Sequence, residues 1–248
     1  MVKDVRQLEK TVEDELYEFA RYWLLRKFQF IDVARDEFES VVEPVVWYED
    51  RPSLERVEAC NMAFTEWLLF EWRYEREKTL LELYLERKGG SLSAETRDRL
   101  CQIFDTQFFS RFKIAYKDVP TGILTLFDER TNKRYDVVDS GAVEVGHWQD
   151  GVLAERIACV DGVWVCVGQL HLYDVSPSSK VGADGPGAVH AEDLEEGFNT
   201  EHLSFYLRLL RDVMGANGRY SSSLNAFRNN EEPTGVCLED QLPEAEED

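Results

Sequence analysis

An Asp-Gly pair at positions 161–162 constrains the fold of this chain more than any other feature, because it lies between two long apolar runs. Asp-Gly in this setting is typical of a β-hairpin with a two-residue turn, in which both turn residues take positive φ angles. Such a turn fixes which residues face each other across the hairpin. The predicted pairs are Val160 with Val163, Cys159 with Trp164, and Ile157 with Cys166.

The predicted hairpin is apolar on both faces. One face carries Ala158 and a set of valines, and the other carries Ile157, Trp164 and two cysteines. A strand pair with one face in water would alternate apolar with polar side chains. We therefore expect one face to lie inside a small barrel and the other to pack against helices. Further short runs of β-branched and aromatic residues between positions 111 and 175 predict a barrel of SH3-like or OB-like type.

Apolar side chains recur every three to four residues through positions 1–110, which predicts a domain of four to five packed helices. Pro44 and the Gly89-Gly90 pair are expected to end helices. Ser93 is expected to begin a last helix that includes Phe104 and Phe108. The chain is thus predicted to be an α+β protein, in which an N-terminal helical domain packs on a small β-barrel at residues 111–175.

The C-terminal part divides into three segments. Residues 176–198 are rich in Ser, Gly and Pro and predict a linker. An amphipathic stretch within residues 199–215, from about Thr200 to Met214, predicts a helix that ends at Gly215. Residues 216–248 are polar and acidic, which is typical of a disordered tail.

Charge and cysteine content narrow the class of partner. The five cysteines are widely spaced, the N-terminus is charged from its first residues, and no stretch is long and apolar enough to span a membrane. These features predict a cytoplasmic protein. The net charge of −21 should repel phosphate backbones and anionic lipids. The expected partner is therefore a protein rather than a nucleic acid or a membrane.

The cysteines and histidines do not form a familiar catalytic or metal-binding motif. Cys159 and Cys166 are expected to pack in the core, and a zinc site would need further ligands, for which His147 and His171 are the nearest candidates. No metal or other cofactor is predicted. Cys166 and His171 are five residues apart, so they should point to opposite faces of a regular strand. This spacing disfavours a Cys–His hydrolase.

Arg156 and Trp148 are candidate binding residues. Arg156 shares a face with Ala158 and the valines, and a guanidinium there needs a carboxylate or carbonyl partner. It could form an internal salt bridge, or it could anchor an anion or a peptide carboxylate. Trp148 and the neighbouring His147 lie in a predicted loop between two glycines. There the tryptophan could be exposed for binding, as interface tryptophans often are, or it could cover one end of the barrel.

The segment Phe64-Thr65-Glu66-Trp67-Leu68-Leu69-Phe70, followed by Thr79-Leu80-Leu81-Glu82 and Tyr84-Leu85, resembles a group of bacterial proteins of the SEC-C-motif-associated type. The resemblance spans roughly residues 60–170 and implies a helical segment followed by a small β unit. In the β unit it rests on Asp128 to Thr131, with Tyr135 beyond them, and on Leu153 and Arg156. Tyr135 is accordingly a further candidate binding residue. The cysteine-rich zinc motif of the group is absent, since Cys237 stands alone in the tail, and the group has no settled activity.

The leading hypothesis is a non-catalytic binding or adaptor protein, whose acidic C-terminal segment docks on a basic partner. One alternative is an enzyme with a site assembled around Cys166, His171 and Arg156. Another is an acidic mimic of nucleic acid, or an inhibitor, that occupies a basic groove.

Overall fold

Apolar stripes in the first 110 residues fold into helices, as predicted. The computed structural model describes residues 5–128, 130–174, 185–189, 193 and 203–220. Five α-helices precede the first strand in this part of the chain: α1 (Val5–Leu24), α2 (Ile31–Val42), α3 (Leu54–Phe70), α4 (Leu80–Lys88) and α5 (Ala94–Thr106). Side-chain caps begin three of them, because Ser53, Thr79 and Ser93 each accept a hydrogen bond from a backbone N–H in the first turn.

The junction between the helices and the barrel differs from the prediction. Helix α5 ends at Thr106 and strand β1 (Phe108–Asp118) begins two residues later, so Phe108 belongs to the strand and not to the helix. Phe104 and Phe108 have helical spacing, which made them look like one stripe. Gln107 breaks that periodicity because it adopts an extended conformation, with a ψ of 141°.

The sheet has six strands: β1, β2 (Ile123–Asp128), β3 (Lys133–Val138), β4 (Val152–Val160), β5 (Val163–Cys166) and β6 (Leu172–Asp174). The strand order is β1-β2-β3-β5-β4-β6, and an additional pairing between β1 and β4 closes a barrel of five strands. Strands β3 and β5 are parallel, and the short helix α6 (Ser140–Glu144) lies between β3 and β4. Of the two predicted types, this arrangement fits the OB-like barrel.

The predicted hairpin register is confirmed. Strands β4 and β5 pair Val160 with Val163, Cys159 with Trp164, and Ile157 with Cys166. Asp161 and Gly162 have φ angles of 52° and 80°, as the two-residue turn requires. Both faces are covered, as predicted. The face with Ala158, Val160 and Val165 belongs to the main core with the helices, and the face with Ile157 belongs to a second core inside the barrel.

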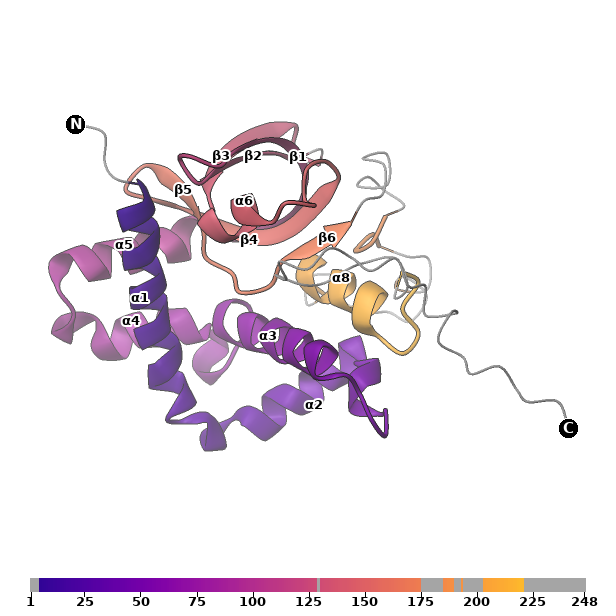
Figure 1. The fold of residues 1–248 in the computed structure, drawn as a ribbon. Helices are drawn as coiled ribbons and strands as arrows, with labels where there is room; N and C mark the ends of the chain where they lie inside the picture. The colour runs from indigo at the N-terminus through magenta and orange to yellow at the C-terminus, as the bar shows by residue number, and fades with distance from the viewer. Residues whose placement is uncertain (1–4, 129, 175–184, 190–192, 194–202, 221–248) are drawn as a thin grey trace, which may run out of the picture.

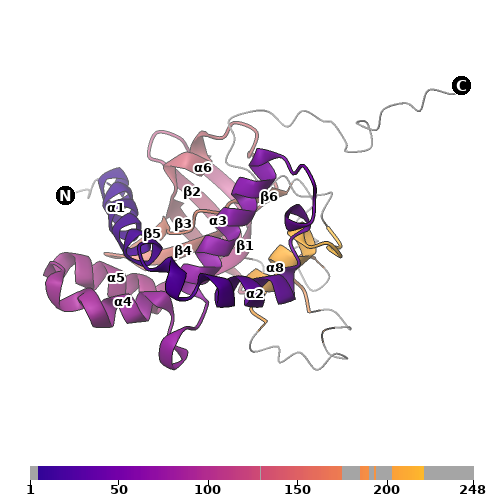
Figure 2. The same ribbon diagram turned by 90° about the horizontal axis from the view of Figure 1, so that it is seen from below.

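The helices surround one side of the barrel. Figure 1 looks along the barrel, with α6 across its opening, and shows α3, α2 and α8 (Phe205–Met214) below β4. Figure 2 shows α3 crossing in front of the strands and α1 at one side of them. Helix α8 begins after the cap Ser204 and ends at Met214, with Gly215 as its C-cap, as predicted. The expected helix start at Thr200, most of the linker at 176–198 and the tail beyond residue 220 lie outside the described residues. In the described ranges, no helix has the length and apolar character that crossing a membrane requires.

Candidate functional site

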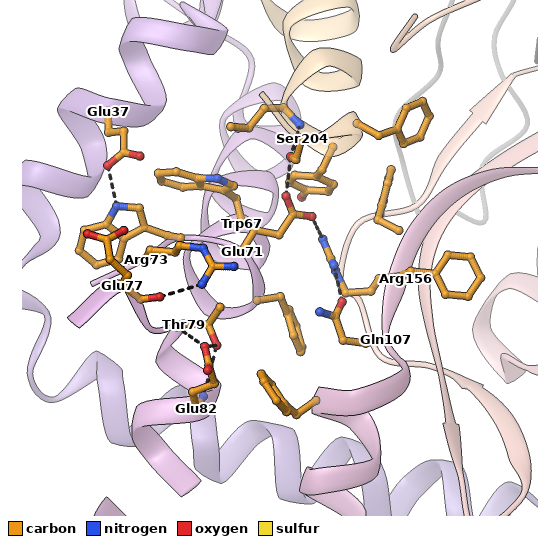
Figure 3. A pocket seen from close by; sticks show the side chains of 18 residues that line it. Glu37, Trp67, Glu71, Arg73, Glu77, Thr79, Glu82, Gln107, Arg156 and Ser204 are labelled. Atoms are coloured by element: carbon orange, nitrogen blue, oxygen red, sulfur yellow. Dashed lines mark hydrogen bonds and ion pairs between the residues drawn. The ribbon is translucent and has the colours of Figure 1, made fainter. Parts of the chain in front are cut away.

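A pocket of about 740 Å³ lies where α3, α5, α8 and the barrel meet (Figure 3). Aromatic side chains form a large part of its wall, and they include Trp67, Phe70, Trp72, Phe104, Phe108 and Phe109. Four carboxylates also line it: Glu37, Glu71, Glu77 and Glu82. The sequence did not indicate this pocket, because its residues come from segments that only the tertiary fold brings together.

Arg156 of β4 reaches the pocket from the barrel and is fully engaged there. Its Nε donates to Glu66 Oε1 at 2.9 Å, its Nη2 to Glu71 Oε1 at 2.5 Å, and its Nη1 to Gln107 Oε1 at 2.5 Å. Burial alone would lower the pKa of Arg156, but the carboxylates of Glu71 and Glu66 outweigh it and raise the pKa. The predicted internal salt bridge is therefore present. A guanidinium held in this way is not free to anchor a partner's carboxylate.

Glu66 of α3 connects the helices to the barrel. Besides Arg156, its carboxylate accepts hydrogen bonds from the backbone N–H groups of Gln169, at 2.9 Å, and Leu170, at 3.2 Å. Only 1% of Glu66 is exposed. Gly168 allows this approach, because a Cβ at that position would lie 2.7 Å from Glu66 Oε2. Glu66 was part of the segment that carries the resemblance, but its partners 90 or more positions away could not be identified from the sequence.

The segment between α3 and α4 forms one rim of the pocket. Trp72 Nε1 donates to Glu37 Oε2 at 2.8 Å, and Arg73 donates to the backbone carbonyl of Glu77 at 2.7 Å. Arg76 and Glu77 have φ angles of 56° and 59°, a left-handed conformation that non-glycine residues rarely adopt. Positive φ angles also occur at Glu43, Asn132 and Asp161, which do not line the pocket, so they do not by themselves mark a functional site.

The lining of the pocket favours a cation. Its two arginines, Arg73 and Arg156, are outnumbered by the four carboxylates. Because Glu71 is paired with Arg156 and Glu82 caps α4, Glu37 and Glu77 carry most of the surplus. Trp72 also stacks on Tyr74, with ring centroids 5.3 Å apart. Aromatic faces carry negative partial charge and attract ammonium and guanidinium groups. The pocket therefore suits a basic group better than an anion.

The other three predicted binding residues do not line the pocket. Trp148 is 1% exposed and stacks on Tyr173, so it covers the barrel end rather than forming an exposed binding surface. Tyr135 lies inside the barrel, and the centroid of its ring is 4.9 Å from that of the Trp164 ring. His147 is half-buried beside Trp148. The burial of Trp148 and Tyr135 removes both side chains from the accessible surface.

The prediction that Cys166 and His171 point to opposite faces is wrong, because Cys166 Sγ lies 3.6 Å from His171 Nε2. Strands β5 and β6 both pair with β4. Five residues separate Cys166 of β5 from Leu172 of β6, whereas only Glu155 and Arg156 separate the β4 residues that pair with these two. The three extra residues reverse the alternation of side chains, since an odd insertion changes the face that follows. Sequence periodicity gave no sign of this insertion.

The enzyme site suggested around Cys166, His171 and Arg156 is only partly assembled, because Cys166 and His171 are in contact but Arg156 is not beside them. Arg156 projects toward the helices, where it contacts Glu66 and Glu71, whereas Cys166 and His171 lie at the inner face of the barrel. Burial raises the pKa of the Cys166 thiol well above its ordinary value, so the protein alone holds the sulfur as a thiol and not as a nucleophilic thiolate. Asp139 and Glu155 also lie beside this pair, and no local sequence pattern indicated them.

Comparison with known proteins gives no match to a protein-family model, to a curated protein or to a solved structure.

Proposed function

We propose that the protein is a non-catalytic binding protein that holds a basic side chain of a partner protein in the pocket between the helices and the barrel. The observation that carries this proposal is the composition of the pocket, which combines aromatic walls with a surplus of carboxylates. A lysine or arginine side chain has an apolar stem and a charged head. The stem would pack on the aromatic rings, and the head would lie among the carboxylates.

The size of the pocket and the charge of the molecule support a protein partner. A pocket of about 740 Å³ accommodates side chains of a bound segment rather than a folded domain. The net charge of −21 would steer a basic partner toward the molecule and speed its association. Phe104, which is 39% exposed, gives such a segment an aromatic contact at the mouth of the pocket.

Isothermal titration of the full chain with a short lysine-rich peptide tests this proposal. Glu77→Gln and Phe104→Ala should each weaken binding about two- to fivefold, because each removes one exposed attraction to the cation. Glu58→Gln is the matched control, since Glu58 is an exposed carboxylate of α3 that does not line the pocket. This control should bind like the unchanged protein.

Two comparisons decide the result. A glutamate-rich peptide of equal length should not bind, and a free polyamine should bind more weakly than the lysine-rich peptide because it lacks the peptide's further contacts. Equal binding of the acidic peptide would overturn the proposal. Binding of the basic peptide that neither Glu77→Gln nor Phe104→Ala weakens would overturn it as well.

A further inference from the structure

Four side chains with metal-ligating atoms converge at one end of the barrel. They are Asp139, Glu155, Cys166 and His171, and one ligand atom from each lies within 4.8 Å of all the others. The cluster is separate from the pocket described above, which none of these four residues lines. It is also enclosed, because the ring of Trp148 stacks on that of His171 with centroids 6.0 Å apart.

The topology of the barrel explains why these residues meet. Strands β3 and β5 are parallel, so Asp139, directly after β3, and Cys166, at the end of β5, lie at the same edge. Glu155 comes from the neighbouring β4 on the inner face. The three-residue insertion after β5 turns His171 to this face as well. Four segments of the chain therefore each contribute one potential ligand.

The cluster has more acceptors than hydrogen-bond donors. His171 Nε2 lies 2.5 Å from Asp139 Oδ2, 3.3 Å from Glu155 Oε2 and 3.6 Å from Cys166 Sγ. One imidazole nitrogen can donate only one hydrogen. Among the described residues, neither carboxylate oxygen of the buried Glu155 accepts a hydrogen bond. A buried carboxylate without a hydrogen bond is costly, and a cation placed among the three acidic groups would offset that cost.

Two distances from His171 agree with tetrahedral coordination. Zinc binds histidine nitrogen, cysteine sulfur and carboxylate oxygen at roughly 2.0–2.3 Å, which places the ligand atoms about 3.3–3.6 Å from one another. The distances from His171 Nε2 to Glu155 Oε2 and to Cys166 Sγ fall in this range. Asp139 Oδ2 is closer, in a hydrogen bond, and would move outward by about 1 Å on coordination.

We propose that Asp139, Glu155, Cys166 and His171 form a closed structural site for a divalent metal ion, zinc by its ligand chemistry. A mixed set of nitrogen, sulfur and oxygen donors suits zinc, whereas magnesium and calcium bind oxygen. With four protein ligands and Trp148 over the cluster, no coordination position is left for a substrate. The ion would tie the ends of β3 and β5 to β4 and to the start of β6.

Metal analysis of the purified full chain, after incubation with zinc and removal of free metal, tests this site. The expected result is about one zinc ion per chain and a lower melting temperature after chelation. Glu155→Gln and Cys166→Ser should lose the bound zinc. Cys159→Ser is the matched control, because Cys159 lies on the same hairpin outside the cluster, and it should keep the metal.

If a variant fails to fold, cobalt bound to the unchanged protein still tests the metal site. The unchanged protein with cobalt in place of zinc should show the visible absorption of a tetrahedral site and a thiolate-to-cobalt charge-transfer band. Absence of bound zinc and of this spectrum in the folded protein would overturn the proposal. Zinc retained in full by both Glu155→Gln and Cys166→Ser would also overturn it.

Discussion

Arg156 connects the barrel to the helices through a buried charged network. Its guanidinium binds Glu66 and Glu71 of the helical part, and only 1% of Arg156 is exposed. Removal of one member of a buried charged network leaves the others without compensation, which costs more than the lost contact itself.

Arg156→Met should therefore lower the free energy of unfolding by about 3–5 kcal/mol, as measured by denaturant titration. Arg134→Met is the control, because Arg134 is an exposed arginine of β3 whose ion pair with Asp136 lies in solvent, and it should change stability by less than about 1 kcal/mol. Equal effects of the two substitutions would show that the buried network does not hold the two parts together.

The type of partner that Arg156 needs could be predicted from the sequence, but the partner residues could not. The position of Arg156 on an apolar face predicted that it needs a carboxylate partner, and the structure provides two. Their identity could not be predicted, because the chain contains 49 acidic residues and the partners lie 90 and 85 positions away. Long-range choices of this kind depend on the packing of whole elements.

Among the elements, the connection between β5 and β6 contributes both to the Arg156–Glu66 network and to the cluster around Cys166. It passes over Glu66, and it turns His171 into the barrel beside Cys166. The hairpin that precedes it could be predicted in full, because Asp-Gly has a strong local preference for one turn. The connection itself has no such local signal, so the alternation of side chains was extended through it incorrectly.

Gly168→Ala tests the role of this connection. The added Cβ would lie 2.7 Å from Glu66 Oε2 and 3.1 Å from Arg156 Cβ, so the loop or the carboxylate must shift. We expect a loss of about 1–3 kcal/mol in the free energy of unfolding. Gly90→Ala is the matched control, since nothing lies within 4 Å of its added Cβ, and it should be close to neutral. A neutral Gly168→Ala would mean that the contact with Glu66 is not restrictive.

At the scale of the whole molecule, the barrel carries two distinct features on its two faces. Its outer face, through Arg156 and Phe109, forms part of the pocket with the helices. Its inner face holds the apolar core and, at one end, the cluster of Asp139, Glu155, Cys166 and His171. Both faces of the hairpin are buried, as predicted from its apolar residues. Strand β4 therefore contributes Arg156 to the pocket on one face and Glu155 to the cluster on the other.

The overall architecture was predictable while the pocket was not. Helical periodicity, the hairpin turn and the change of pattern near residue 110 are local signals, and they gave the α+β class and the order of the two parts. The pocket combines α3, the segment after it, α5, β4 and α8. No local pattern records which of these segments meet, so Glu71, Glu77 and Phe104 could not be distinguished from ordinary surface and core residues.

The most direct test of the account is an NMR titration of the full chain with a lysine-rich peptide, followed through the indole N–H signals of its tryptophans. Trp72 lines the pocket and donates to Glu37, whereas Trp148 is enclosed at the barrel end, so the two report on separate places. We predict that the Trp72 signal shifts with increasing peptide while the Trp148 signal stays in place. A Trp72 signal that does not move at saturating peptide, or a shift confined to Trp148, would contradict the claim that the pocket receives a basic side chain.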